Sequence, residues 1–436
     1  MKVKKFGGTS VGSAERIRNV GKLISGCKKD IVVLSAMSGT TNSLLEIYSA
    51  IKDGDRLRVS GLIDSLRQKY TLTIDELYKT EEYKEEATKA IDEIFNELKD
   101  ISEKPSSAKT EKEIVSKGEM MSTRLMQLHL QEEGFKPALL PALDFMKIDR
   151  HGEPVEDFIR SEASKALARH PEADLYITQG FICRNEQGEI DNLQRGGSDY
   201  TASLLGALLN AEEIEIWTDI DGMHNNDPRF VEDTRPVHNL HFEEAAELAY
   251  FGAKILHPTC ILPARQHNVP VRLLNTMDPA AEGTLIENNL ERSSIKAVAA
   301  KDNITAIKIK SGRMLLAYGF LKKVFEIFEK YETSIDMITT SEVGVSLTID
   351  NEKNLPRIEE ELSRLGTVTV DRDMVIICVV GDLEWTNKGF EAAALEALRN
   401  VPVRMISYGG SNYNISFLIR KEDKTKALRL LSYHLF

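Results

Sequence analysis

A glycine turn close to the start of the chain has the composition of a phosphate site. The strand-like run Val3–Phe6 contains Lys5 and leads directly into Gly7-Gly8-Thr9-Ser10. Paired glycines leave backbone N–H groups uncrowded, and the two hydroxyls add further donors. Gly7 and Gly12 are spaced as in a Walker A loop, but Ser13 stands where that motif requires lysine. We therefore predict a phosphate-handling turn of another design, with an ordinary strand-to-helix connection as the alternative.

A second glycine-rich cluster combines charges and hydroxyls ahead of an apolar helix. The run Arg195-Gly196-Gly197-Ser198-Asp199 precedes the apolar helical segment 203–209. A helix N-terminus attracts anions through its free N–H groups and its dipole, and a guanidinium suits a carboxylate. This pattern predicts an anion site at the helix start. In the alternative, Ser198 or Asp199 only caps the helix.

Further polar residues follow another apolar run and predict contacts to a polyphosphate. Thr218 and Asp219 end a strand-like segment, and the turn at Asp227 projects the guanidinium of Arg229. Lys254 adds a cation at a helix-like end. Two cations near strand ends suit the phosphates of a nucleotide. The acidic residues in this region lack the spacing and the closing glutamate of an EF-hand, so we do not predict a calcium loop.

The elements that must position these residues read as an α/β fold. Apolar runs at 28–42, 174–181, 213–219 and 269–275 look like buried parallel strands, and helix-length segments separate them. In such sheets the ligand lies beyond the carboxyl ends of the strands. We therefore expect the polar strand ends to form the rim of the active site.

The segment from 57 to about 117 is rich in charged residues at helical spacing and is broken near Pro105. We predict solvated helices there, most of them without a chemical role. Glu119 follows at the start of the next helix. A glutamate at this position either caps the helix or faces the site, where it could hold an amino group.

Composition excludes several classes of function. The chain has 436 residues, 42% of them hydrophobic, with 68 acidic against 56 basic residues and a net charge of −12. Such a chain should not bind nucleic acid or anionic membranes non-specifically, and small-molecule chemistry fits better. It carries no apolar run of signal-peptide or membrane-spanning length, so we predict a cytoplasmic protein.

Cysteine and histidine patterns give no metal or disulfide framework. The four cysteines are scattered without a C-x-x-C pair, which argues against both disulfides and a zinc knuckle. His238 and His241 stand near two glutamates, but this spacing is commoner on a solvated turn than around a metal. We predict no metal site built by the protein.

Together these motifs resemble the aspartate kinases of the amino-acid kinase superfamily, over nearly the whole chain. The resemblance rests on 5–11, 35–42, 118–119, 178–181, 195–202, 217–219 and 251–254. It implies a mainly parallel sheet sandwiched by helices, followed by two ferredoxin-like ACT domains. It also implies transfer of the γ-phosphoryl group of MgATP to the β-carboxylate of L-aspartate, giving 4-phospho-L-aspartate, the first step toward lysine, threonine and methionine. A carboxylate nucleophile is ionised at neutral pH, so positioning and charge neutralisation should suffice for catalysis.

The same resemblance implies roles for single residues. Lys5 would stabilise the transferred phosphoryl group, and Asp199 would organise that lysine or a metal-bound water. The residues implied to hold aspartate are Thr41, Glu119, Phe181, Arg195 and Ser198. Those implied to bind ATP are Lys5, Gly7, Gly8, Ser10, Thr218, Asp219, His224, Asp227, Arg229 and Lys254, with Mg²⁺ carried by the nucleotide. His224 stands where relatives often have tyrosine.

The C-terminal third contains an internal repeat. Residues 319–321 open a helix that leads to 335–339, and 389–391 open another that leads to 403–407. Each unit reads as a ferredoxin-like βαββαβ pattern. The pair resembles ACT domains, and we expect a kinase domain over 1–295, a first ACT domain over 296–372 and a second over 373–429. We expect residues 430–436 to return and complete the first sheet.

The resemblance further implies regulation by an amino acid, L-lysine first and L-threonine second. The first ACT modules of two chains would pair into a homodimer, and a tetramer of two such dimers stays open as the alternative. The residues implied to line the effector site are Met314, Phe320, Leu321, Ser334, Asp336, Thr340, Ser341 and Glu342. Two other functions stay open: a kinase acting on glutamate or N-acetylglutamate, and an amino-acid sensor built on an inactive kinase body.

Overall fold

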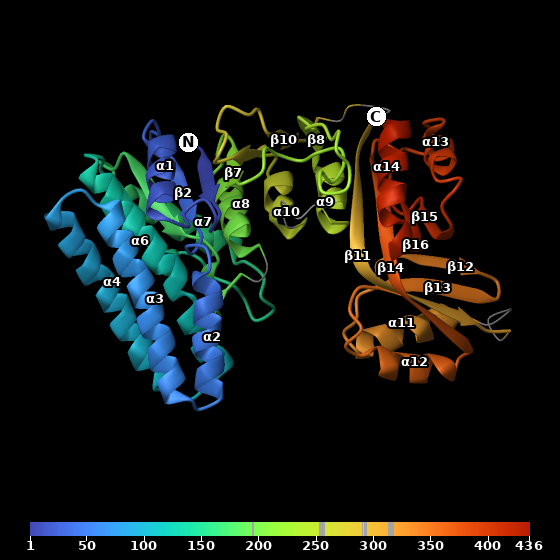
Figure 1. The fold of residues 1–436 in the computed structure, drawn as a ribbon, viewed down its shortest axis with the longest axis horizontal. Helices are drawn as coiled ribbons and strands as arrows, with labels where there is room; N and C mark the ends of the chain where they lie inside the picture. The colour runs from blue at the N-terminus through green and yellow to red at the C-terminus, as the bar shows by residue number, and fades with distance from the viewer. Residues whose placement is uncertain (194–195, 253–257, 290, 292–293, 313–317) are drawn as a thin grey trace. The chain divides into compact units, whose positions relative to one another are not determined.

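A computed structural model describes residues 1–193, 196–252, 258–289, 291, 294–312 and 318–436 (Figure 1). The chain divides into two compact units. The kinase unit comprises Met1–Met223 and Ile255–Asn288, and the regulatory unit comprises His224–Lys254 and Asn289–Phe436. Each unit has its own sheet and core.

The kinase unit is built on a mainly parallel sheet with the strand order β3-β4-β2-β1-β7-β9-β10. Its strands are β1 Val3–Phe6, β2 Ile31–Leu34, β3 Pro137–Leu140, β4 Leu175–Gln179, β7 Ile214–Thr218, β9 Val271–Asn275 and β10 Thr284–Glu287. Neighbouring strands from β3 to β9 are parallel, and only β10 runs antiparallel to β9. A separate hairpin consists of β5 Ile182–Arg184 and β6 Ile190–Asn192. The predicted α/β fold class is confirmed.

Strand β1 lies between β2 and β7. The strands β2 to β4 are added on one side of β1, and β7, β9 and β10 are added later on its other side. Such a reversal of strand order opens a crevice beyond the carboxyl ends of the strands. All four residues of β2 and all five of β4 are buried, as the continuous apolar runs predict. The turn after β1 is therefore placed at the crevice by the topology.

Helices cover this sheet. They are α1 Ala14–Ile24, α2 Thr40–Lys52, α3 Arg56–Leu77, α4 Glu81–Ser102, α5 Ala108–Val115, α6 Lys117–Glu132, α7 Glu156–Ala168, α8 Gly197–Leu208 and α10 Pro258–Gln266, with a 3₁₀ turn at Ala142–Asp144. Helix α6 packs against β2, β3 and β4, and α8 packs against β1, β2 and β7. These two helices bring Glu119 and Asp199 to the strand ends.

The charged segment after residue 56 forms helices α3 and α4, and a break separates α4 from α5, as predicted. Helices α3 and α4 lie side by side (Figure 1), and each buries one face. Tyr70 and Phe95 meet edge to face, with ring centroids 6.0 Å apart, inside the main core of this unit. The two helices are therefore not only solvated, as expected from their charge, because their apolar faces pack against α6 and α1.

The regulatory unit has one six-stranded sheet of order β12-β13-β11-β14-β16-β15. The strands of this sheet are β11 Ile295–Lys310, β12 Ile338–Ser341, β13 Gly344–Ile349, β14 Thr367–Gly381, β15 Val403–Tyr408 and β16 Asn414–Arg420. A short strand of the same unit, β8 Asn239–His241, is not part of this sheet. The helices of the unit are α9 Phe242–Tyr250, α11 Phe320–Lys330, α12 Leu355–Ser363, α13 Phe390–Ala397 and α14 Lys424–Leu435, with a 3₁₀ turn at Lys421–Asp423.

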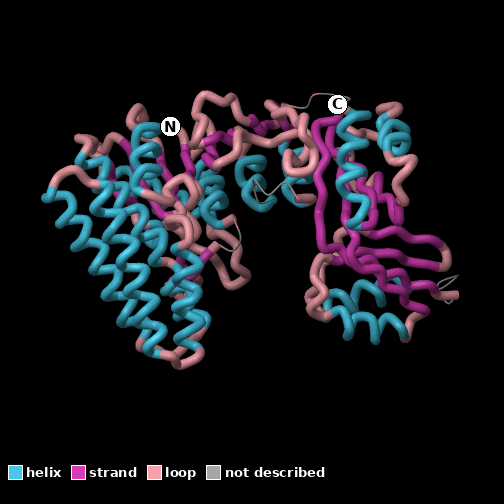
Figure 2. The backbone as a smooth tube through the Cα atoms, in the orientation of Figure 1, coloured by secondary structure: helices cyan, strands magenta, loops and turns pink. Residues whose placement is uncertain are grey.

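Strands β11 and β14 are long, pair antiparallel, and run through both halves of this sheet (Figure 2). One half packs α11 and α12 around a core that includes Ile307 and Leu347. The other half packs α13 and α14 around Ile377 and Phe417. The predicted pair of ACT-type modules is therefore present, and the two modules share their central strands.

The structure differs from expectation at the C-terminus. Residues 430–435 form the end of helix α14. Leu431 and Phe436 pack in the core around Ile377 and Phe417, and this segment does not add a strand to the first module. Residues 295–301, the first half of β11, pair with the part of β14 that belongs to the second module. An apolar helical stripe in 424–435 explains this result. The domain boundaries given above stay a prediction.

Among the residues that the structure describes, no helix is both long and apolar enough to span a membrane.

Glycine 206, in the interior of α8, gives a test of the packing between helix and sheet. Alanine usually stabilises a helix interior relative to glycine by about 1 kcal/mol. At Gly206, however, an added Cβ would stand 2.2 Å from Ile214 Cγ1 of β7. We expect Gly206→Ala to lower the free energy of unfolding by about 1–3 kcal/mol, measured by chemical denaturation. The matched control is Gly61→Ala in α3, where nothing lies within 4 Å of the added Cβ and a small gain is expected. Equal effects of the two substitutions would contradict the packing described.

Candidate active site

A cavity of about 560 Å³ lies at the carboxyl ends of the central strands of the kinase unit. Its lining comes from the turn after β1, the loop after β2, the first turns of α6 and α8, and the residues around β5 and β6. The lining residues are Lys5, Gly8, Ser35, Ala36, Met37, Ser38, Gly39, Thr41, Glu119, Phe181, Asn192, Gly196, Gly197, Ser198 and Asp199. Seven residues proposed from the sequence are therefore brought together here: Lys5, Gly8, Thr41, Glu119, Phe181, Ser198 and Asp199.

The glycine turn after β1 packs tightly against the loop after β2. The Gly7 N–H donates to the Trp217 carbonyl at 3.3 Å, and the Ser38 N–H donates to the Gly8 carbonyl at 3.1 Å. A Cβ at Gly8 would stand 2.7 Å from the Ala36 carbonyl oxygen, so a side chain cannot be accommodated there without moving backbone. Glycine at this position is therefore required by the close approach of the two loops.

Lys5 and Asp199 form an ion pair at the centre of the site. The Lys5 Nζ lies 2.6 Å from Asp199 Oδ1, and the two side chains are 12% and 14% exposed. Lys5 comes from β1, and Asp199 from the first turn of α8. The N-cap of α8 is Gly196, which is left-handed, and no side chain caps the helix. Capping, the alternative for Ser198 and Asp199, is thus not their role, and Asp199 instead holds the ammonium at the helix N-terminus.

Glu119 presents a buried carboxylate to the same cavity. Its Oε1 accepts a hydrogen bond from the Ala36 N–H at 3.2 Å, while Oε2 is buried without a hydrogen-bond partner among the described residues. Burial raises the pKa of Glu119 to about 8. Of the two roles open from the sequence, the structure favours the one facing the site. An unpaired buried carboxylate oxygen suits a cationic group such as an ammonium.

Phe181 adopts a strained backbone conformation at the wall of the cavity. Its φ is +70°, in the left-handed region that bulky residues avoid. The Phe181 N–H donates to Thr201 Oγ1 of α8 at 3.0 Å, which holds this conformation. A Cβ at Gly180 would stand 2.5 Å from Ser198 Oγ, so β4 and α8 nearly touch. The sequence analysis missed Gly180 and Thr201, although a glycine directly after a strand was a signal for such a contact.

Thr41 reaches the cavity from the start of α2. The preceding Gly39 has a φ of +81° and leads the loop into the helix. Lys69 of α3 donates from Nζ to the Ser38 carbonyl at 2.6 Å, and its burial lowers the pKa of that ammonium. The helical segment after residue 56 therefore supports the loop, a role that its charge pattern did not reveal.

Comparisons with known proteins identify the chain's relatives. A model of the amino acid kinase family matches residues 1–275, and a model of an ACT domain matches residues 377–435. The lysine-sensitive aspartokinase 3 of Escherichia coli is 34% identical over 100% of this chain and 99% of its own length. The chain belongs to the aspartokinases of the amino acid kinase family.

Solved aspartokinase structures have the same fold. E. coli aspartokinase III in complex with aspartate and ADP, in its R-state, is 33% identical and has a TM-score of 0.86 over 100% of both chains. The same E. coli enzyme in complex with lysine and aspartate, in its T-state, gives a TM-score of 0.83 at 33% identity, also over 100% of both chains. Aspartokinases are kinases with a carboxyl acceptor, and this chain is an enzyme of that kind.

Three of the nucleotide contacts expected of an aspartokinase lie near the cavity but do not line it. Ser10 is buried, and its Oγ lies 3.2 Å from Thr276 Oγ1. Thr276 in turn donates through its N–H to the Thr218 carbonyl at 2.8 Å, and Thr218 Oγ1 donates to Asp219 at 3.1 Å. These contacts order the ends of β7 and β9.

Other proposed nucleotide residues belong to the regulatory unit. His224 Nδ1 lies 2.9 Å from Thr234 Oγ1. Arg229 makes a bidentate pair with Asp227, with Nε to Oδ1 at 2.9 Å and Nη2 to Oδ2 at 2.7 Å. The guanidinium expected to project freely is thus engaged within its own turn. Arg195, Lys254 and Met314, also proposed from the sequence, lie outside the described residues.

The residues proposed for the effector site surround α11 and the hairpin of β12 and β13. Phe320 is buried in the core around Ile307 and Leu347, and Leu321 packs against that core. Ser334 and residues 340–342 are exposed. Asp336 differs, because its side chain is only 1% exposed and already has partners within the chain.

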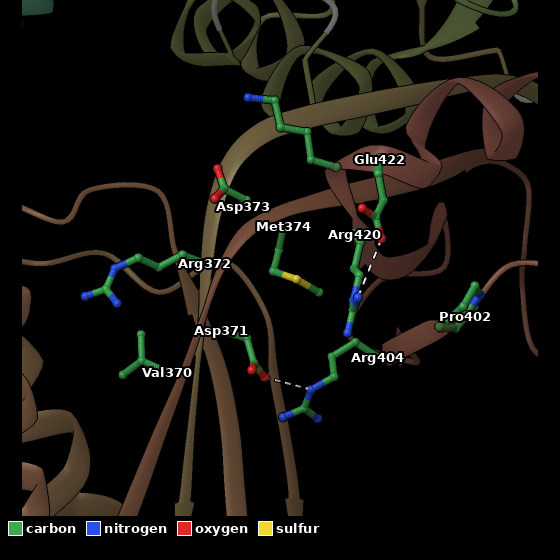
Figure 3. Close-up of a pocket in the computed structure, with 11 residues that line it drawn as sticks. Val370, Asp371, Arg372, Asp373, Met374, Pro402, Arg404, Arg420 and Glu422 are labelled. Atoms are coloured by element: carbon green, nitrogen blue, oxygen red, sulfur yellow. Dashed lines mark hydrogen bonds and ion pairs between the residues drawn. The ribbon is translucent and has the colours of Figure 1, made fainter.

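A cavity of about 810 Å³ lies in the regulatory unit where β14 passes from one module to the other (Figure 3). Asp371 pairs with Arg404 at 3.0 Å, and Arg420 pairs with Glu422 at 3.5 Å. None of the proposed effector residues that the structure describes lines it. Two of its arginines are thus already paired with carboxylates of the same lining, and we assign the cavity no ligand.

Burial of Glu119 makes stability depend on pH in a predictable direction. The pKa in the folded protein, about 8, exceeds the ordinary value of 4.5, so the unfolded chain releases this proton first as pH rises. The protonated Glu119 therefore makes its full contribution to the free energy of unfolding below pH 4.5, and this contribution is lost as the pH rises from 4.5 to about 8. At about 1.4 kcal/mol per pKa unit the loss is at most about 5 kcal/mol. We expect Glu119→Gln to remove this loss, measured by chemical denaturation at pH 5 and pH 8. The same pH dependence in both proteins would contradict the assignment.

Proposed function

We propose that the protein phosphorylates the side-chain carboxylate of L-aspartate with MgATP and produces 4-phospho-L-aspartate. The observation that carries this proposal is one cavity that holds both the Lys5–Asp199 pair and the unpaired oxygen of Glu119. A cation suits the phosphoryl group, and a carboxylate suits the ammonium of an amino acid. The E. coli relative has been solved with aspartate and ADP, which agrees with this pairing of ligands.

Aspartate binding would use both ends of the substrate. Glu119 Oε2 would accept the α-ammonium group, and Arg195 would bind a carboxylate through its two-pronged guanidinium. Thr41, Phe181 and Ser198 line the same cavity and would complete the contacts. Arrival of an ammonium would favour the ionised form of Glu119, so the buried acid would gain its charge only when substrate is present.

The chemical step needs no general base. A carboxylate oxygen of aspartate would form a bond to the γ-phosphorus as the bond between that phosphorus and the bridging oxygen of ADP breaks. Lys5 would stabilise the charge on the transferred group, and Asp199 would position Lys5. Glycine backbone groups at Gly7 and Gly8 would lie against the phosphates.

Mg²⁺ would reach the site on the phosphates of ATP, where it neutralises charge. Its preference is for oxygen ligands, and the Asp199 carboxylate would face it or a water that it carries. We propose Ser10, Thr218, Asp219, His224, Asp227, Arg229 and Lys254 as further ATP contacts.

We further propose that this reaction opens lysine, threonine and methionine biosynthesis and that an amino acid regulates it through the ACT modules. L-Lysine is the first candidate, because the E. coli relative is named lysine-sensitive and was solved with lysine, and L-threonine is the second. Pairing of the first modules into a homodimer, the boundaries at 295 and 372, and the effector residues named above belong to this proposal.

The test is ADP release with MgATP and L-aspartate, compared with L-glutamate and N-acetyl-L-glutamate. We expect turnover with aspartate alone. A preference for either glutamate compound would assign the chain to another amino-acid kinase. Binding of lysine or threonine without turnover on any of these acids would support the sensor alternative.

Lys5 should be essential for the chemical step. We expect Lys5→Ala to lower kcat by at least about 10²–10³-fold while ATP still binds, because the ammonium acts on charge that develops in the transition state. The matched control is Lys4→Ala on the same strand, which pairs with Glu215 and does not line the cavity. Near-normal turnover of Lys5→Ala would contradict the mechanism.

A further inference from the structure

A buried polar cluster in the regulatory unit joins helix α9 to the first ACT module. Asp336 Oδ1 lies 2.6 Å from Lys301 Nζ and accepts a hydrogen bond from the Tyr250 hydroxyl at 2.9 Å. The Lys301 ammonium also stands over the Tyr250 ring, 4.4 Å from its centroid. Tyr250 is the last residue of α9, Lys301 belongs to β11, and Asp336 precedes β12. Three elements thus converge on one carboxylate.

Lys301 has a second carboxylate within reach. Asp350 Oδ2 lies 3.0 Å from its Nζ, and the side chain of Asp350 is 42% exposed, against 1% for Asp336. The other oxygen of Asp336, Oδ2, is buried and has no hydrogen-bond partner among the described residues. The cluster therefore contains one shared ammonium, two carboxylates and one unused buried acceptor.

The main chain around Asp336 is fixed on β13. The Asp336 N–H donates to the Thr348 carbonyl at 2.9 Å, and the Met337 N–H donates to Thr348 Oγ1 at 3.0 Å. Asp336 cannot readily move away to meet a new ligand. A change at this site would have to be an exchange of partners around a stationary carboxylate.

We propose that Lys301 is an internal ligand of Asp336, and that the ammonium of an amino-acid effector displaces it onto Asp350. This inference rests on the regulation suggested under the proposed function. Two ammonium groups on one buried carboxylate would repel each other, and this repulsion favours replacement of Lys301 by the incoming group. Asp350 keeps the displaced ammonium paired, which makes the exchange feasible without leaving a lone buried charge.

The exchange of Lys301 for the effector would change the contacts of Tyr250 at the end of α9. Tyr250 shares Asp336 Oδ1 with Lys301, so loss of the lysine changes both the hydrogen bond and the ring contact of this tyrosine. Two residues later, Gly252 has a φ of +120°, and a Cβ there would stand 2.3 Å from the Ala300 carbonyl oxygen. The chain at Gly252 is thus pressed against β11 beside Lys301. Lys254, a proposed ATP contact, follows directly in the sequence.

The test compares binding of L-lysine and L-threonine to variants of the whole protein by titration calorimetry. Lys301→Met removes the internal competitor, and we expect the effector to bind about tenfold more tightly. Asp350→Asn removes the acceptor for the displaced ammonium, and we expect weaker binding. The side chain of Asp350 is 42% exposed, so this second variant should fold even if the first is destabilised.

Lys424→Met is a matched control. Lys424 pairs with Asp302 at 2.7 Å and stands 4.2 Å from the centroid of the Phe230 ring, in the second module. Like Lys301, it contacts both a carboxylate and an aromatic ring, but it does so away from Asp336. Its replacement should therefore leave the affinity for the effector unchanged. Tyr250→Phe should bind the effector but show a smaller effect of that effector on the KM for ATP.

The outcomes separate this inference from the proposed function. Turnover without effector tests the kinase, because it does not involve the exchange. Equal or weaker binding by Lys301→Met, or binding of neither amino acid to either protein, would overturn the inference even in an active kinase. Tighter binding by Lys301→Met in a protein that phosphorylates no acid would support the exchange and overturn the proposed function.

Discussion

The contact between Lys5 and Asp199 is the interaction on which the site is organised. It joins a central strand to the N-terminus of a helix that packs over that strand and both its neighbours. Because β1 lies where the strand order reverses, the ammonium stands at the crevice and not within the sheet. The carboxylate keeps this cation in a partly buried place where, alone, it would be costly. The tight approaches at Gly8 and Gly180 follow from bringing two loops and a helix this close to one another.

The regulatory unit obeys a different constraint, which is the sharing of strands. Because β11 and β14 each run through both modules, one continuous ladder of backbone hydrogen bonds joins the two modules. The cluster at Asp336 lies beside one of these strands and touches the end of α9. Under the proposed exchange, this cluster would change partners while the packed cores on either side resist gradual deformation.

Local patterns predicted much of this molecule. The buried strands, the glycine turn after β1 and the helix start at 196–199 all follow from short stretches of sequence. What the sequence did not reveal depends on distant residues. The burial of Glu119 and the support of Ser38 by Lys69 arise only when the chain has folded. The pairing of Arg229 with Asp227 is local, but the residue types alone did not distinguish a projecting guanidinium from an engaged one. The final residues were misplaced because a short apolar segment can complete a sheet or cover one, and the choice depends on which strand edge remains open.

The most direct test of this account is a crystal structure of the protein with L-aspartate and ADP. We predict that the ammonium of aspartate lies within hydrogen-bond distance of Glu119 Oε2, and that Lys5 Nζ faces the phosphates while keeping its contact with Asp199. Aspartate bound outside the cavity, or Lys5 turned away from the nucleotide, would contradict the central claim.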